Sequence, residues 1–178
     1  PHDDVATGRF EQAEFAANLH QVAEGTAEEE YQDPASFFGR TYLTAGLSDL
    51  LVRAASRLAG KGGDPVIDLQ TNFGGGKTHS MIALYHLASG VAVGKLGDVG
   101  ALLKDAGITL PKKISRAVLV GQMISPSSPK LQEPGISTNT LWGALAYQLA
   151  GRAGYEIVRT DDEAGTNPGE KLHELFVQ

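Results

Sequence analysis

The sequence predicts an α/β protein in which a partial three-layer αβα core follows a helical N-terminal extension. Three observations predict this class. Residues 1–63 carry apolar side chains at the spacing of helices. A β-prone run at residues 66–70 precedes a glycine-rich loop and an apolar helical segment. A second apolar run at residues 117–120 has the continuous hydrophobic character of a strand buried on both faces of a parallel sheet. We therefore place the core at residues 64–178.

The extension is predicted to be helical because it contains, in order along the chain, sequence signals for helix starts, for apolar helix faces and for helix ends. A first amphipathic face comprises Phe15, Leu19 and Val22. Asp33 followed by Pro34 is a typical start of the next helix, since the carboxylate caps the first turn and proline fits its first position. The clearest helix begins after Thr44 and ends at Gly60. Its apolar face comprises Leu47, Leu51, Ala54 and Leu58.

The core is predicted from a change of hydrophobic period after the linker at residues 61–65. The strand at residues 66–70, the glycine loop and a helix over residues 78–88 come first, and residues 117–120 supply the second strand. The connection between these strands is long enough for the right-handed crossover of a βαβ unit. Residues 125–136 are expected to form an extended surface loop. Further helices are predicted at residues 98–105, 139–149, 155–158 and from 167 onward.

Composition and charge exclude several classes of protein. The 178 residues are 42% hydrophobic and 20% charged, which is typical of a globular chain and not of a disordered or fibrous one. No cysteine is present, so a disulfide scaffold, a thiolate zinc site and a cysteine nucleophile are excluded, and we expect a reducing, cytoplasmic location. The apolar runs are too short to cross a membrane. A net charge of −6 without a basic cluster argues against direct nucleic-acid binding.

A glycine loop at residues 71–78 is the chemical centre of the sequence. It matches the phosphate-loop pattern G-x-x-x-x-G-K-[ST] at Gly76, Lys77 and Thr78, whereas Thr71 stands at the first glycine position. Consecutive glycines allow backbone N–H groups to turn toward a polyphosphate, and the following helix adds the positive end of its dipole. The loop therefore predicts a nucleotide-binding site of the P-loop NTPase type.

The residue roles follow from the chemistry of ATP and Mg²⁺, the two cofactors that we expect. Lys77 would place its charge between the β- and γ-phosphates and is the predicted catalytic residue, and the Thr78 hydroxyl would be a ligand of Mg²⁺. The predicted nucleotide-binding residues are Asn72, Phe73, Gly74, Gly75, Gly76, Lys77, Thr78 and His79. The alternative is a tight strand-to-helix turn with Lys77 as a solvated charge. ATP is expected and not GTP, because no Asn-Lys-x-Asp motif occurs.

The carboxylate with which a P-loop hydrolase orients water is not evident in the sequence. An acidic run at residues 161–163 follows two apolar residues, but Arg159 and Thr160 interrupt the pattern, and an acidic helix end is the alternative. Asp68 in the first predicted strand could support the loop or could simply be exposed. Arg40 could reach a phosphate or could lie on the surface.

Several stretches of the chain, taken together, are similar to a known family. They are residues 15–19, 31–34, 37–44, 73–79 and 140–149, including the strings Phe-Phe-Gly-Arg-Thr-Tyr-Leu-Thr and Phe-Gly-Gly-Gly-Lys-Thr-His. They resemble the N-terminal part of large prokaryotic AAA-type ATPases that are catalogued as a domain of unknown function. The resemblance spans essentially the whole chain. It implies that a loop without the first glycine is normal, and that the genes accompany phage-defence systems.

The resemblance also implies that this chain is the ATP-binding part of a larger Mg-dependent ATPase. In the family, an apolar strand ending in Asp-Glu lies beyond the segment that residues 172–178 resemble, so we expect the catalytic acid in the remainder of the polypeptide. The expected partners are a nucleotide, that remainder and, as a further hypothesis, other copies in a homo-oligomer. Two other functions stay open: a nucleotide-dependent scaffold or sensor that never hydrolyses ATP, and a P-loop kinase.

Overall fold

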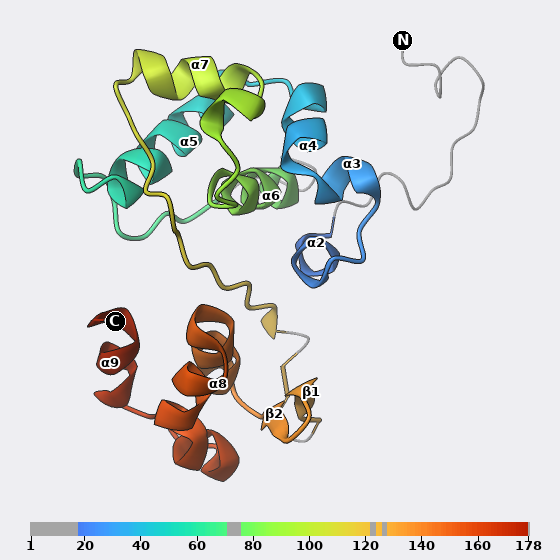
Figure 1. The fold of residues 1–178 in the computed structure, drawn as a ribbon, viewed down its shortest axis with the longest axis vertical. Helices are drawn as coiled ribbons and strands as arrows, with labels where there is room; N and C mark the ends of the chain where they lie inside the picture. The colour runs from blue at the N-terminus through green and yellow to red at the C-terminus, as the bar shows by residue number, and fades with distance from the viewer. Residues whose placement is uncertain (1–17, 71–75, 122–123, 126–127, 178) are drawn as a thin grey trace. The chain divides into compact units, whose positions relative to one another are not determined.

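The computed structural model describes residues 18–70, 76–121, 124–125 and 128–177 of the 178-residue chain (Figure 1). Within these ranges the chain is mostly helical, and its named strands form one antiparallel hairpin. It divides into two compact units, Pro1–Ile114 (unit 1) and Ser115–Gln178 (unit 2). No helix in the described ranges is both long and apolar enough to span a bilayer.

Unit 1 is built from helices. In chain order they are α2 (Leu19–Glu24), α3 (Glu29–Gln32), α4 (Pro34–Arg40), α5 (Ala45–Leu58), α6 (Lys77–Leu87), the 3₁₀ helix η1 (Val93–Lys95) and α7 (Asp98–Asp105). Two begin where the sequence predicts: Asp33 accepts from the Ser36 N–H at 2.7 Å, and Thr44 accepts from the Leu47 N–H at 3.2 Å. Phe15, from the first predicted apolar face, lies outside the described residues.

The core of unit 1 holds α6 in place. The most buried large apolar side chains of this core are Val22, Leu51, Ile82, Leu96, Val99 and Leu103. His86 on α6 is 1% exposed, and its Nε2 lies 2.7 Å from the carbonyl oxygen of Tyr31. A carbonyl oxygen can only accept, so Nε2 of His86 carries the proton and donates it. One face of α6 is thus fixed by packing and by a buried hydrogen bond.

Unit 2 combines a hairpin with a sharply bent helix. Its elements are β1 (Lys130–Glu133), β2 (Ile136–Thr138), α8 (Leu141–Ala164) and α9 (Lys171–Val177). Ala150 and Gly151 interrupt α8 with non-helical backbone angles, and Gly151 has a φ of 60°, so the helix consists of two arms. Gly154 on the second arm lies so close to Ala146 on the first that a Cβ there would overlap the Ala146 carbonyl oxygen. The two arms therefore pack closely against each other.

The predicted αβα core is wrong for the part of the chain that the structure describes. Residues 66–70 and 117–120 form no strand, and the β1–β2 hairpin lies in a region where the sequence predicts an extended loop. A strand needs a neighbour to bond its backbone. Here the Val118 N–H donates to Oε1 of Gln148 at 2.8 Å, and the Val118 carbonyl accepts from Nε2 of Gln148 at 3.0 Å. A helix side chain thus takes the place of a neighbouring strand.

Candidate functional site

Four of the predicted nucleotide-binding residues stand at the start of α6: Gly76, Lys77, Thr78 and His79. The other four, together with Thr71, lie outside the described residues: Asn72, Phe73, Gly74 and Gly75. Gly76 is exposed, whereas the three side chains that follow it are half-buried. The described part of the candidate site is therefore the first turn of α6 and what packs against it.

The backbone of Gly76 adopts a conformation that favours glycine. Its φ of 74° and ψ of 17° are left-handed, a region in which other residues are strained. An ideal Cβ built at Gly76 would have no heavy atom of the described residues within 4 Å. The left-handed backbone angles are therefore the feature that favours glycine here.

The N-terminus of α6 differs from the starts of the other α-helices in the described chain, and only the short 3₁₀ helix η1 shares its lack of a capping side chain and of an acidic residue there. Side chains cap α2, α4, α5 and α8, through Asn18, Asp33, Thr44 and Thr140. α3 and α7 lack such a cap but carry acidic residues in the first turn. α6 has neither a capping side chain nor an acidic residue there. Since the first N–H groups of a helix have no partner within it and the dipole is positive at this end, this terminus suits an anion.

His79 joins the first turn of α6 to the end of α4. Its Nε2 lies 3.1 Å from the Thr41 hydroxyl oxygen, and that hydroxyl donates to the Phe37 carbonyl oxygen at 2.7 Å. The single hydroxyl proton is used in this second bond, so Nε2 of His79 must be the donor to Thr41. The His79 and Phe37 rings are 4.6 Å apart between centroids. Burial lowers the pKa of His79, which favours the neutral ring.

Thr41 is a residue that the sequence analysis did not associate with the loop. It lies 38 residues before His79, and no spacing rule connects two residues that far apart. Its neighbour Arg40 forms an exposed ion pair with Glu30, which fits the surface alternative for this arginine. Asp68 is exposed and accepts from the Gln70 side-chain amide at 2.5 Å.

The first acidic residue of the run at 161–163 bonds to a neighbouring helix. Asp161 Oδ2 accepts from Lys171 Nζ of α9 at 2.5 Å. This hydrogen bond to Lys171 lowers the pKa of the Asp161 carboxyl. The carboxylate therefore has a structural partner within unit 2.

Asp162 is buried between the two arms of α8. It is 1% exposed and accepts from the backbone and side chains of Asn139 and Thr140, with the shortest bond from Thr140 Oγ1 at 2.6 Å. Tyr155 Oη lies 3.2 Å from Oδ2 of Asp162 and 2.9 Å from the carbonyl oxygen of Ser137, so its one proton is shared between these two acceptors. Burial, followed by the charge of Asp162, raises the pKa of Tyr155 to about 12. Asp162 thus links the second arm of α8 to the start of the first.

Comparison with known proteins identifies the family. The model of the DUF499 N-terminal domain matches residues 2–178, which is almost the whole chain. The chain belongs to this family. No curated protein and no solved structure matches it. The match confirms the resemblance to a domain of unknown function, whereas ATP hydrolysis and a role in phage defence stay predictions for this DUF499 domain.

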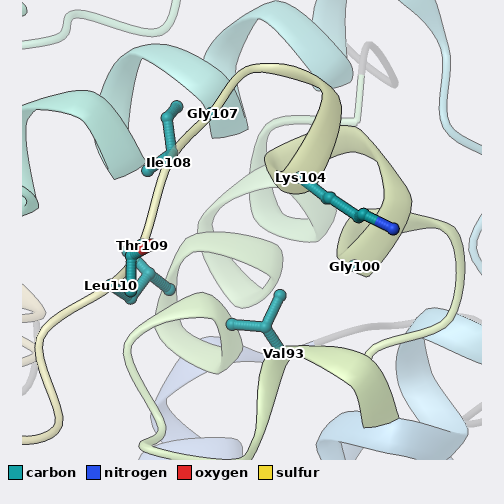
Figure 2. A pocket seen from close by; sticks show the side chains of 7 residues that line it. All are labelled: Val93, Gly100, Lys104, Gly107, Ile108, Thr109 and Leu110. Carbon is teal, nitrogen blue, oxygen red and sulfur yellow. The ribbon is translucent and has the colours of Figure 1, made fainter.

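A groove in unit 1 of the DUF499 domain lies beside α7 and the segment that follows it (Figure 2). Its volume is about 410 Å³, and its lining residues are Val93, Gly100, Lys104, Gly107, Ile108, Thr109 and Leu110. None of the predicted nucleotide-binding residues is among them. Within the described residues, no group of three or more histidine and acidic side chains could hold a metal ion.

Proposed function

We propose that this domain binds Mg-ATP at the N-terminus of α6, as the nucleotide-binding part of a larger ATPase. The observation that carries the proposal is a helix start with no capping side chain, headed by a left-handed glycine and followed by the Lys-Thr pair of the phosphate-loop pattern. Each of these features suits a bound phosphate. The four capped helices of the same chain show the arrangement that a helix start takes when a side chain fills this role.

The chemistry of binding follows from the residues of the first turn. The backbone N–H groups donate to phosphate oxygens, and the helix dipole favours the negative charge. Lys77 adds a positive charge between the β- and γ-phosphates, and the Thr78 hydroxyl supplies one oxygen ligand to Mg²⁺. Bound Mg²⁺ would neutralise part of the phosphate charge. ATP is favoured over GTP because the guanine-reading Asn-Lys-x-Asp motif does not occur in the sequence.

The role within a larger protein rests on the family resemblance. It favours an AAA-type ATPase of the cytoplasm, connected with phage defence, in which the remaining polypeptide supplies the catalytic acid and other copies assemble with it. A non-hydrolysing scaffold or sensor is the second candidate. One observation favours this second candidate: Asp161 and Asp162 have structural partners within unit 2.

The proposal is tested by calorimetric titration of Mg-ATP into the wild-type chain and two lysine variants. Lys77→Ala should weaken binding about 10- to 100-fold, because one charge-assisted contact to the phosphates is lost. Lys95→Ala, which removes an exposed lysine of η1, is the matched control and should bind like the wild type. Equal affinities of all three proteins would remove Lys77 from the site, and a wild-type chain that binds no Mg-ATP would overturn the proposal.

A further inference from the structure

The segment between α4 and α5, residues 41–44, is held in place from both sides. At its start, the Thr41 hydroxyl donates to the Phe37 carbonyl and accepts from His79 of α6. At its end, Thr44 caps α5, and the Thr44 N–H donates to the carbonyl oxygen of Tyr42 at 3.0 Å. The backbone of Tyr42 therefore lies between two anchored residues, one of which contacts the first turn of α6.

Tyr42 nevertheless leaves its side chain in solvent. The residue is 85% exposed, more than the other exposed large hydrophobic residues in the described chain, of which Val66 follows at 80%. By contrast, its neighbours in the same region are packed: Phe37 is 2% exposed, and its ring lies against His79. A tyrosine on a held backbone has few torsions left to order when a ligand binds, so it offers contact area at a low entropic cost.

We infer that Tyr42 is the stacking platform for the base of the nucleotide. The inference rests on the proposed function, which places the phosphates on the first turn of α6. Thr41 contacts that turn, and Tyr42 is one Cα step of about 3.8 Å further along the chain. A nucleotide extends its base away from its phosphates, and an aromatic ring next to the phosphate site can stack on the base. Every base has a π face, and stacking depends on this face alone.

The ligand class that this arrangement recognises is therefore a nucleoside triphosphate and not an inorganic polyphosphate. The first turn of α6 would bind both through their phosphates, because N–H groups and Lys77 contact only the phosphate chain. Only the nucleotide would gain the contact with Tyr42. The difference in affinity between the two ligands isolates the contribution of the base.

The experiment titrates ATP and inorganic triphosphate, each with Mg²⁺, into the wild type, Tyr42→Ala, Tyr42→Phe and Phe176→Ala. Phe176 is an exposed aromatic residue of unit 2, 66% exposed, and serves as the matched control. We expect Tyr42→Ala to weaken ATP about 5- to 100-fold and to leave triphosphate binding unchanged. Tyr42→Phe should keep ATP affinity within about twofold, because the ring is retained, and Phe176→Ala should bind both ligands like the wild type.

The outcomes separate this inference from the proposed function. If the wild type binds both ligands and Tyr42→Ala binds ATP as tightly as the wild type does, the stacking role is overturned while the phosphate site stands. An equal loss of both ligands in Tyr42→Ala would also overturn it, because the residue would then act on the phosphate site or on folding. If the wild type binds neither ligand, both the proposed function and the stacking role are overturned.

Discussion

The hydrogen bond from His79 to Thr41 links the start of α6 to the end of α4. Because the Thr41 hydroxyl donates to the Phe37 carbonyl, it can only accept from His79, and this fixes the neutral His79 ring with its proton on Nε2. A second proton on the ring would add a positive charge at the positive end of a helix dipole. Burial disfavours that charge as well and lowers the pKa of His79. Protonation of His79 should therefore oppose folding.

Replacement of His79 by glutamine should make unit 1 less sensitive to acid. The folded-state pKa of His79 lies below its ordinary value of 6.5, so the unfolded chain takes up the proton first as the pH falls. Stability that is present above pH 6.5 is then lost on acidification toward the lowered pKa. Glutamine keeps an N–H donor for Thr41 but does not titrate. Thermal unfolding by circular dichroism from pH 7.5 to 5 should show a smaller decrease in midpoint for His79→Gln, and equal decreases would contradict the assignment.

The residues of the candidate site could be predicted only where the signal is local. Gly76, Lys77 and Thr78 form a contiguous motif, and the structure places them at a helix start, as the motif requires. The partner of His79 could not be predicted, because Thr41 reaches it through tertiary packing. The acidic run at 161–163 shows the opposite case. Its sequence pattern is compatible with a catalytic carboxylate or with an acidic helix end. In the structure Asp162 is buried and has a structural role, and no local pattern indicates this burial.

At the scale of elements, the bent helix α8 depends on a close approach between its two arms. Asp162 of the second arm bonds to residues at the start of the first arm. Gly143 lies in that first arm, and a Cβ at this position would overlap the Asp162 carboxylate. The carboxylate cannot move aside easily, because Asn139, Thr140 and Tyr155 all bond to it. The hydrogen bonds of Asp162 therefore require a residue without a side chain at position 143.

Gly143→Ala should destabilise unit 2 by about 1–3 kcal/mol, because the added methyl group forces the buried carboxylate away from its donors. Trp142, the single tryptophan of the chain, is adjacent and reports the unfolding of this unit by fluorescence in a urea titration. Gly46→Ala is the control, since Gly46 is a helical glycine of α5 with open space at its Cβ position, and it should leave the Trp142 transition unchanged. An unchanged midpoint for Gly143→Ala would contradict the close approach.

The sequence predicts the helices of this chain better than its strands, because helix signals are local and strand pairing is not. Helix signals are local, and the Asp33 and Thr44 caps lie where the sequence predicts them. A sheet depends on pairing between segments that are distant in the chain, and an apolar run says nothing of its partner. The run at residues 117–120 is typical of a buried strand, yet in the structure the Gln148 side chain bonds to the backbone of Val118. The sequence predicts helices at residues 139–149 and 155–158, which fall on the two arms of α8, but it does not predict that these arms pack closely.

At the scale of the whole molecule, the two units differ in the chemistry that their described residues offer. Unit 1 contains the uncapped helix start with Lys77 and Thr78, which suits the binding of phosphate. Unit 2 contains the acidic run, but Asp161 is bonded to Lys171 and Asp162 is enclosed by its donors. Phosphoryl transfer to water needs a group that orients the attacking water in addition to a phosphate cradle and a metal. Binding of ATP and its hydrolysis therefore require different groups.

The 178-residue chain should bind Mg-ATP and show little steady-state hydrolysis. The loop, Lys77 and Mg²⁺ would lower only part of the barrier, because a group that orients the attacking water is also required, and the two aspartates of the acidic run already have structural partners. Phosphate release measured at saturating ATP should match that of Lys77→Ala, which serves as the blank. The contrary result would be robust turnover that Lys77→Ala and Glu163→Gln both abolish. Glu163 is the exposed member of the acidic run, so such a result would identify it as the carboxylate that orients water.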